Sequence, residues 1–303
     1  MTEIIRLDTE KNNERTTDID ILSTEEILQK INAEDQSVAK VVEKCIPKIS
    51  ILVDKIVERI RIGGRLFYIG AGTSGRLGIL DAAECPPTYG VDNNLVIGVI
   101  AGGNDAMFVA QEGAEDSMEL PVVDLSSYHF CEKDVLIGLA ASGRTPYVIG
   151  GLKFGQEIGA LTAAISCVTN AEISKYAECS IEAVTGAEAI MGSTRMKAGT
   201  AQKLILNMIS TSVMIKLGKV YKNYMVDLKP TNQKLVIRSK NMIRTLTGVS
   251  QEKADLLYEE SGHNVKKALI MEIMNVDRNS AEGALEKANG HIKSAIQILG
   301  GEI

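Results

Sequence analysis

Five short runs of apolar residues lie in the middle of the chain, separated by stretches with helical periodicity. The apolar runs span residues 66–69, 95–100, 135–140, 163–168 and 180–184, and the helical stretches lie near 75–85, 105–116, 145–158 and 171–177. Continuous apolar runs of this length are typical of strands that are buried on both faces. The alternation predicts an α/β fold, with a parallel five-stranded sheet flanked by helices.

The flanking segments have a different pattern. A polar arm of about 20 residues comes first, and Ser23 and Glu26 then form a capping-box pattern that predicts a helix over 24–34. A second helix is expected over 36–62, bent near Pro47, and a long one over 198–219. After Tyr221 no strand pattern is found, and four short helices are expected. We therefore predict three parts: an N-terminal arm with helices (1–53), the α/β domain (54–222) and a small C-terminal helical bundle (223–303).

Composition narrows the class of protein. The net charge is −6, aromatic residues make up 4% and tryptophan is absent, which argues against a nucleic-acid partner. No apolar run approaches the roughly 20 residues that span a bilayer, and the N-terminus lacks the order of a signal peptide, so we expect a cytoplasmic protein without a membrane partner. Three widely spaced histidines and five scattered cysteines predict no metal site, no histidine-based triad and no cofactor.

A glycine-rich turn, residues 70–76, follows the first apolar run and precedes a helical pattern. Free N–H groups and the helix dipole favour an anion at such a turn, and the hydroxyls of Thr73 and Ser74 add donors that suit a phosphate. The turn lacks the Gly-Lys-Ser/Thr ending of a nucleotide-triphosphate loop, and its third glycine falls at 75 rather than at the 77 of Gly-x-Gly-x-x-Gly. Taken alone, it also fits an ordinary strand-to-helix turn.

Two further turns repeat the same chemistry. Residues 140–145 follow the third apolar run, and residues 192–197 follow the fifth and precede the long helix. Because the carboxyl ends of parallel strands meet at one edge of a sheet, the three turns together predict a phosphate-type ligand. Arginines 76, 144 and 195 are candidate countercharges. The candidate substrate-binding residues are Gly72, Thr73, Ser74, Arg76, Ser142, Gly143, Thr145, Ser193, Thr194 and Lys197.

The motifs resemble those of a known family. Gly-x-Gly-Thr-Ser and Ser-Gly-x-Thr are similar to the phosphosugar-binding turns of sugar isomerase domains. Together with residues 81–90, 112–116 and 193–200, they resemble the N-acetylmuramic acid 6-phosphate etherase family over essentially the whole chain. The resemblance implies a cytoplasmic lyase that converts N-acetylmuramic acid 6-phosphate to N-acetylglucosamine 6-phosphate and D-lactate. It also implies a homodimer with active sites near the subunit interface, and a ubiquitin-associated-like C-terminal bundle.

Two glutamates match the catalytic pair of that family. An ether alkoxide is a poor leaving group and needs a general acid, and a base must remove the proton next to the aldehyde of the opened sugar. Glu84 lies among small apolar residues and before Pro86-Pro87, which predicts a poorly solvated carboxyl suited to an acid. We assign Glu84 as the proton donor to lactate and the activator of water, and Glu115 as the base.

Two other functions would use the same binding turns. One is a non-catalytic phosphosugar sensor like the glucokinase regulatory protein, and the other is an aldose–ketose phosphosugar isomerase. The presence of both glutamates favours the lyase over the sensor, and an isomerase has no need of the sequence around Glu84.

Overall fold

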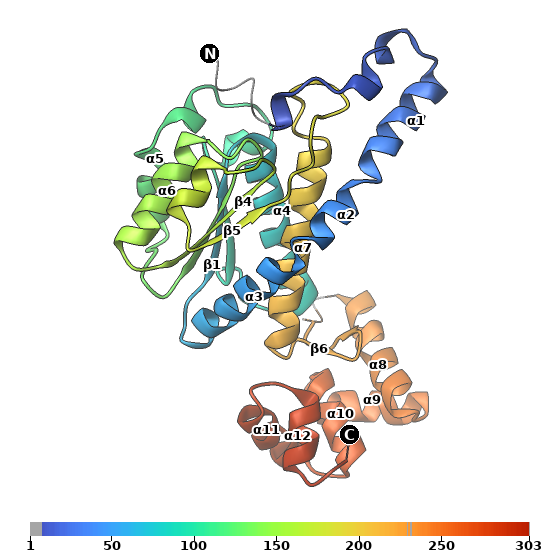
Figure 1. The fold of residues 1–303 in the computed structure, drawn as a ribbon. Helices are drawn as coiled ribbons and strands as arrows, with labels where there is room; N and C mark the ends of the chain where they lie inside the picture. Colours follow the sequence, from blue (N-terminus) through green and yellow to red (C-terminus); the bar gives the residue numbers. More distant parts are fainter. Residues whose placement is uncertain (1–7, 229, 231, 303) are drawn as a thin grey trace. The chain divides into compact units, whose positions relative to one another are not determined.

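The computed structural model describes residues 8–228, 230 and 232–302 (Figure 1). The strands are β1 (Leu66–Gly70), β2 (Val96–Ile100), β3 (Val135–Leu139), β4 (Leu161–Ser166), β5 (Cys179–Glu182), β6 (Val220–Tyr221) and β7 (Tyr224–Met225). The α-helices are α1 (Thr24–Asp35), α2 (Val38–Glu43), α3 (Ile46–Arg61), α4 (Gly72–Tyr89), α5 (Leu120–Ser127), α6 (Pro146–Glu157), α7 (Lys197–Lys216), α8 (Gln233–Thr247), α9 (Gln251–Glu260), α10 (Val265–Met274), α11 (Arg278–Lys287) and α12 (Ile292–Ile298). Short 3-10 helices include η5 (Asn104–Met107), η6 (Ala114–Asp116) and η7 (Glu172–Tyr176).

The predicted parallel sheet is confirmed, with strand order β2-β1-β3-β4-β5. The chain passes from β1 to β2 on one side and then crosses to β3 on the other side of β1. A crevice forms at the carboxyl ends of strands where the order reverses in this way, so it lies between β1 and β3. Gly70, the last residue of β1, pairs with Leu139, the last residue of β3.

Helices cover both faces of this sheet. On one face α4 packs closely: a Cβ at Gly78 would lie 2.9 Å from the Cβ of Tyr68 on β1. On the other face, Phe67 and Ile69 of β1 belong to a buried core with Leu125 of α5 and residues of α6. Alternate residues of β1 therefore point to different helix layers, as the period of a strand requires.

Several local predictions are confirmed and others are wrong. The capping box of Ser23 and Glu26 starts α1 as expected. The single helix expected over 105–116 is wrong: η5 and η6 replace it, and between them Gly113 adopts a positive φ angle that a helix does not allow. The helix α5 was not expected, and β4 begins two residues before the predicted run.

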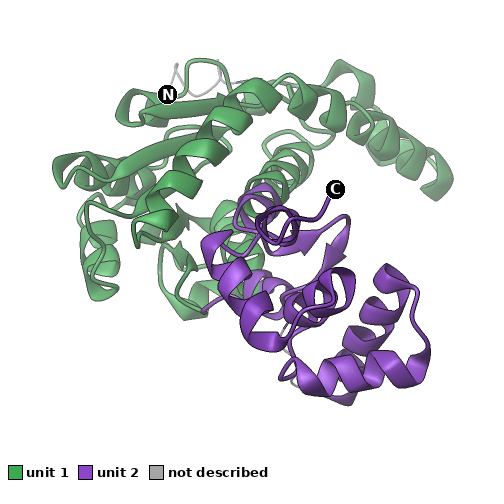
Figure 2. Ribbon diagram, turned by 90° about the horizontal axis from the view of Figure 1, so that it is seen from below, with its two compact units in different colours: residues 1–83, 93–210 green, residues 84–92, 211–303 purple. Residues whose placement is uncertain are grey.

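The described residues form two compact units, shown in different colours in Figure 2. One contains residues up to 83 together with 93–210, and the other contains 84–92 together with those from 211 onward. The first unit contains both the N-terminal arm and the sheet, so the two units do not test the boundary at residue 53. The predicted division into three parts, at residues 53 and 222, stays a prediction.

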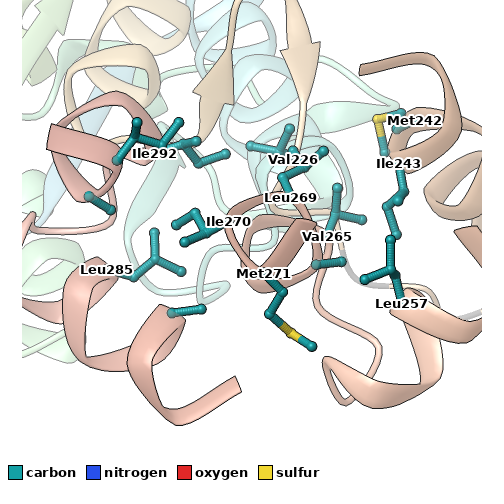
Figure 3. Packing of buried hydrophobic residues seen from close by; sticks show 14 of the residues in the cluster. Val226, Met242, Ile243, Leu257, Val265, Leu269, Ile270, Met271, Leu285 and Ile292 are labelled. Atoms are coloured by element: carbon teal, nitrogen blue, oxygen red, sulfur yellow. The ribbon is translucent and has the colours of Figure 1, made fainter. Parts of the chain in front are cut away.

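The C-terminal part has its own hydrophobic core (Figure 3). Buried residues of this core come from the segment after β7 and from helices α8 to α12, among them Val226, Ile243, Leu269 and Ile296. The expectation of four helices without strands is wrong, because the described residues of this part contain five α-helices and the short strand β7, which pairs with β6 just before it. The turn-rich sequence of residues 227–232 predicts a linker at the start of this part, and two of its residues, 229 and 231, lie outside the described residues.

No helix within the described ranges is both long and apolar enough to cross a membrane.

Candidate functional site

The glycine-rich turn lies where β1 ends and α4 begins. Gly72, with a φ of +52°, takes a left-handed conformation that disfavours side-chain-bearing residues. The first intrahelical bond of α4 runs from Gly75 N–H to Ala71 O, so the N–H groups of residues 72–74 have no acceptor within the helix. With the helix dipole, these donors make the start of α4 suitable for a phosphate.

The second predicted turn is next to the first. Residues 140–145 follow β3, and the paired residues Gly70 and Leu139 bring the two turns together at the β1–β3 crevice. Gly143 is buried at φ +69°, and a Cβ there would lie 2.5 Å from the Cβ of Ala171, so glycine is required. Ser142 and Thr145 are partly exposed.

The third predicted turn, residues 192–197, leads into the N-terminus of α7, which lies close to the first turn. A Cβ at Gly199 would lie 3.5 Å from Cγ2 of Thr73 and 3.6 Å from the carbonyl oxygen of Thr194. Ser193 and Thr194 are partly exposed and lie in the long loop that joins the end of β5 to the start of α7. Thr73 thus lies beside the start of α7.

Lys197 is held in a buried network. Its side chain is 3% exposed, and its ammonium donates to Glu34 of α1 at 2.7 Å, where Arg15 binds the same carboxylate. The buried carboxylate of Glu188 accepts from the backbone N–H groups of Lys197 and Ala198, at 2.8 and 2.9 Å. Burial raises the pKa of Glu188. A role for Lys197 as a phosphate ligand stays a prediction, since its charge is already paired.

Ser74 and Arg76 also have protein partners. Ser74 is buried, and its hydroxyl donates to Oε1 of Gln202 on α7 at 2.9 Å. The Arg76 guanidinium donates to the carbonyl oxygens of Ala106 and Met107, at 2.7 and 3.0 Å. Arg76 therefore connects the first turn of α4 to η5.

One cavity joins this turn to a predicted catalytic residue. It has a volume of about 130 Å³, and Gly72, Arg76, Glu112 and Glu115 are among its lining residues. Glu115 is exposed on η6. A carboxylate and a phosphate-type turn thus share one cavity within a single unit of the chain.

Glu84 has a different setting from the one expected. It lies on α4, three turns after Gly72, and is exposed in the single chain although Cys85 and Ala82 are buried. Small apolar neighbours in sequence do not bury a helical residue, because adjacent positions point about 100° apart. The expectation that its neighbours shield Glu84 is therefore wrong for the single chain.

Some buried polar residues near these turns were not singled out from the sequence. They are Glu34, Glu188 and Gln202, which contact residues of the predicted turns, and Asp81, which accepts bonds from Tyr68, Asn207 and Ser210. Burial raises the pKa of Asp81. For Asp81 and Gln202 the available signal was a polar residue within an apolar helical pattern, but their partners are distant in sequence. Among the described residues, no group of three or more His, Cys, Asp or Glu side chains is arranged to hold a metal ion.

Comparisons with known proteins bear on the whole chain. The family model of the glucokinase regulatory protein N-terminal SIS domain matches residues 48–156. An N-acetylmuramic acid 6-phosphate etherase of Clostridium botulinum (strain Eklund 17B / Type B) is 57% identical over 98% of this chain and 98% of that protein. One of Bacillus cereus (strain G9842) is 56% identical, over 96% of this chain and 99% of that protein.

Among solved structures, a phosphoheptose isomerase from Francisella tularensis is 14% identical, with a TM-score of 0.45 over 62% of this chain and 98% of that chain. That likeness is too weak to bear on function. The two relatives match this chain over nearly its whole length, and the chain belongs to the N-acetylmuramic acid 6-phosphate etherase family.

Proposed function

We propose that this protein cleaves the D-lactyl ether of N-acetylmuramic acid 6-phosphate, yielding N-acetylglucosamine 6-phosphate and D-lactate for the recycling of cell-wall sugars. The observation that carries the proposal is the cavity that Glu115 shares with the first turn of α4, in a chain 57% identical to an etherase. The turn would hold the phosphate and Glu115 would face the sugar. The sugar itself extends beyond so small a cavity.

The reaction needs two proton carriers and no change in oxidation state overall. Glu115 removes the proton from the carbon next to the aldehyde of the opened sugar, and the electron pair forms a carbon–carbon double bond. The ether bond on the next carbon breaks, and Glu84 protonates the departing lactate oxygen. Water then adds to that carbon, giving one proton to Glu84, while Glu115 returns its proton to the neighbouring carbon. Each carrier contributes roughly 10²- to 10⁴-fold to the rate.

The length of α4 shows whether Glu84 can reach a sugar that is bound at the start of the same helix. Gly72 and Glu84 are twelve residues apart on one helix, so they are separated by about 18 Å along its axis. Six bonds join the phosphorus to the ether oxygen and four join Cα of a glutamate to its carboxylate oxygen, and with the hydrogen bond between these two oxygens the extended path spans at most roughly 16 Å. A sugar anchored at the start of α4 is therefore out of reach of Glu84 on the same helix.

A homodimer resolves this difficulty. In a symmetric pair, each active site would take the phosphate turns and Glu115 from one subunit and Glu84 from the other. The exposure of Glu84 in the single chain supports such a role, because an exposed carboxylate is accessible to a second copy. We place the enzyme in the cytoplasm and propose no nucleic-acid partner, in keeping with its net charge of −6.

The test is to incubate purified protein with N-acetylmuramic acid 6-phosphate and to measure D-lactate. Lactate release is expected, and Glu84→Gln and Glu115→Gln should each lower it by about 10²-fold or more. In D₂O, Glu84→Gln should still exchange the proton next to the aldehyde, because the base is intact, whereas Glu115→Gln should not.

Other outcomes would identify the other functions. Binding of phosphosugars without lactate release from the wild-type chain would favour the sensor. Interconversion of aldose and ketose phosphates would favour the isomerase. Exchange in the Glu115→Gln variant but not in Glu84→Gln would reverse the assigned roles.

A further inference from the structure

Gln202 is a buried polar residue at the phosphate turn whose hydrogen bonding is incomplete. It lies on α7 with no exposed surface, and its Oε1 accepts the hydroxyl proton of Ser74 at 2.9 Å. Its Nε2 is buried and has no partner among the described residues. Buried amide N–H groups are nearly always paired in folded proteins, so this orphan group calls for an explanation.

The chemistry of the amide suggests one. The oxygen and nitrogen of a glutamine side chain exchange places when the amide turns by 180°. In the turned state, Nε2 donates to the Ser74 oxygen and Oε1 takes the position that lacks a partner. Unpaired buried carbonyl oxygens are better tolerated than unpaired N–H groups. The hydroxyl proton of Ser74 is then free for another acceptor.

The position of Ser74 indicates what that acceptor is. Ser74 is in the first turn of α4, where the backbone N–H groups of residues 72–74 have no acceptor within the helix. A phosphate at this turn would accept from these groups and from the Ser74 hydroxyl. In the amide orientation seen in the structure, Ser74 has no proton left to offer the phosphate.

We propose that Gln202 is a positioning residue for the phosphate end of the substrate: its amide turns to donate to Ser74, and Ser74 donates to the phosphate. The proposal rests on the phosphate site described under the proposed function. Bonds that run in one direction strengthen one another, so the Gln202–Ser74–phosphate chain binds better than Ser74 alone.

A simpler interpretation is that the Ser74–Gln202 hydrogen bond serves only to hold α4 and α7 together. The two readings differ in what they predict for affinity. A link affects the stability of the fold and leaves phosphate binding unchanged in a folded variant. A positioning role lowers affinity for phosphorylated ligands, and only while Ser74 is present.

The decisive experiment is a double-mutant cycle with Gln202→Met, Ser74→Ala and the double variant. For each, the dissociation constant of N-acetylglucosamine 6-phosphate is measured by calorimetry, together with KM and kcat. Gln202→Met should weaken binding about three- to tenfold, and raise KM more than it lowers kcat. In the Ser74→Ala background, the same change should have no further effect.

Ser210→Ala is the matched control, since Ser210 is a buried hydrogen-bonding residue on the same helix that contacts Asp81 instead. It should leave the affinity unchanged. Equal effects of Gln202→Met with and without Ser74, or unchanged affinity in a folded Gln202→Met variant, would overturn the proposal.

Should Gln202→Met not fold, Gln202→Glu provides a second measurement. Its carboxylate keeps the bond that accepts from Ser74, and so preserves a purely structural link, but it cannot donate. Because the added charge itself repels a phosphate, the same change is also measured in the Ser74→Ala background. A larger loss of binding with Ser74 present supports the proposal, and an equal loss in both backgrounds, or unchanged binding, contradicts it. Because binding is measured directly, these results stand apart from lactate release, whose absence in the wild-type chain would reject the proposed reaction instead.

Discussion

Arg76 has a positive charge that suits a phosphate ligand, but in the folded chain its guanidinium binds backbone carbonyls. From the sequence it was a candidate phosphate ligand. In the structure it donates to two backbone carbonyls of η5, and it lines the cavity that also contains Glu115. The guanidinium thus connects the start of α4 with the segment that leads to the predicted base.

This contact makes a prediction about rate. Arg76→Met should lower kcat by about 10- to 100-fold, because the segment that carries Glu115 loses a fixed position, and small displacements of catalytic groups are costly. Affinity for N-acetylglucosamine 6-phosphate should change little. Arg59→Met is the control, since Arg59 likewise donates to a backbone carbonyl, that of Glu132. A large loss of affinity with kcat unchanged would instead make Arg76 a phosphate ligand.

At the scale of elements, the start of α7 depends on contacts with distant segments. The carboxylate of Glu34 on α1 accepts hydrogen bonds from Arg15 of the arm and from Lys197 of α7. The hydrogen bond from Arg15 is the main cause that lowers the pKa of Glu34 to about 2. The arm also contacts the loop before α7, where the Thr16 hydroxyl donates to Ala189 O. The arm and α1 therefore support the turn that carries Ser193 and Thr194.

Glu34→Gln should destabilise the fold by roughly 3–5 kcal/mol at pH 7, because it leaves the Lys197 ammonium buried without its counterion. The folded pKa of Glu34 lies below its ordinary value of 4.5, so the stabilisation is fully present above pH 4.5 and is lost as the pH falls towards 2. Urea unfolding at pH 7, 4.5 and 3 should show the difference between wild type and variant shrinking as the pH falls.

The combined variant Glu34→Gln/Lys197→Met should recover part of that stability, since it removes the unpaired charge as well. A constant difference between wild type and Glu34→Gln from pH 7 to 3 would show that the ion pair contributes nothing at these positions.

For the whole molecule, the proposed dimer predicts complementation between two inactive variants, which a monomeric enzyme would not show. If each active site combines Glu115 of one subunit with Glu84 of the other, two inactive variants should restore each other. Mixing Glu84→Gln with Glu115→Gln chains under conditions of subunit exchange should recover about a quarter of wild-type lactate release. Half of the dimers are then mixed, and each mixed dimer holds one intact site.

Mixing Glu115→Gln with the double variant Glu84→Gln/Glu115→Gln should recover nothing, because no intact site forms. If the first mixture also stays inactive while size-exclusion chromatography shows exchanged dimers, the two glutamates act within one subunit. The helix length that separates Gly72 from Glu84 would then need another explanation.

The local and repetitive features of this protein follow from the order of its amino acids. Apolar runs predicted all five strands of the sheet, most clearly β1, β3 and β4, which are buried on both faces and so have no polar alternation. Capping residues placed α1, and the motifs placed the glycine-rich turns and the family. The helical pattern over 105–116 was misleading, because the positive φ of Gly113 is incompatible with a continuous helix there.

The use of each polar side chain follows from the packing of the folded chain. Contacts between residues distant in sequence assigned Arg76 to η5, Lys197 to Glu34 and Ser74 to Gln202, and these pairings depend on which helices pack together. The strand order decided that the turns at 70–76 and 140–145 share one crevice. A sequence records which groups are able to donate or accept, but the geometry of packing selects the partner, because a hydrogen bond requires contact within about 3 Å.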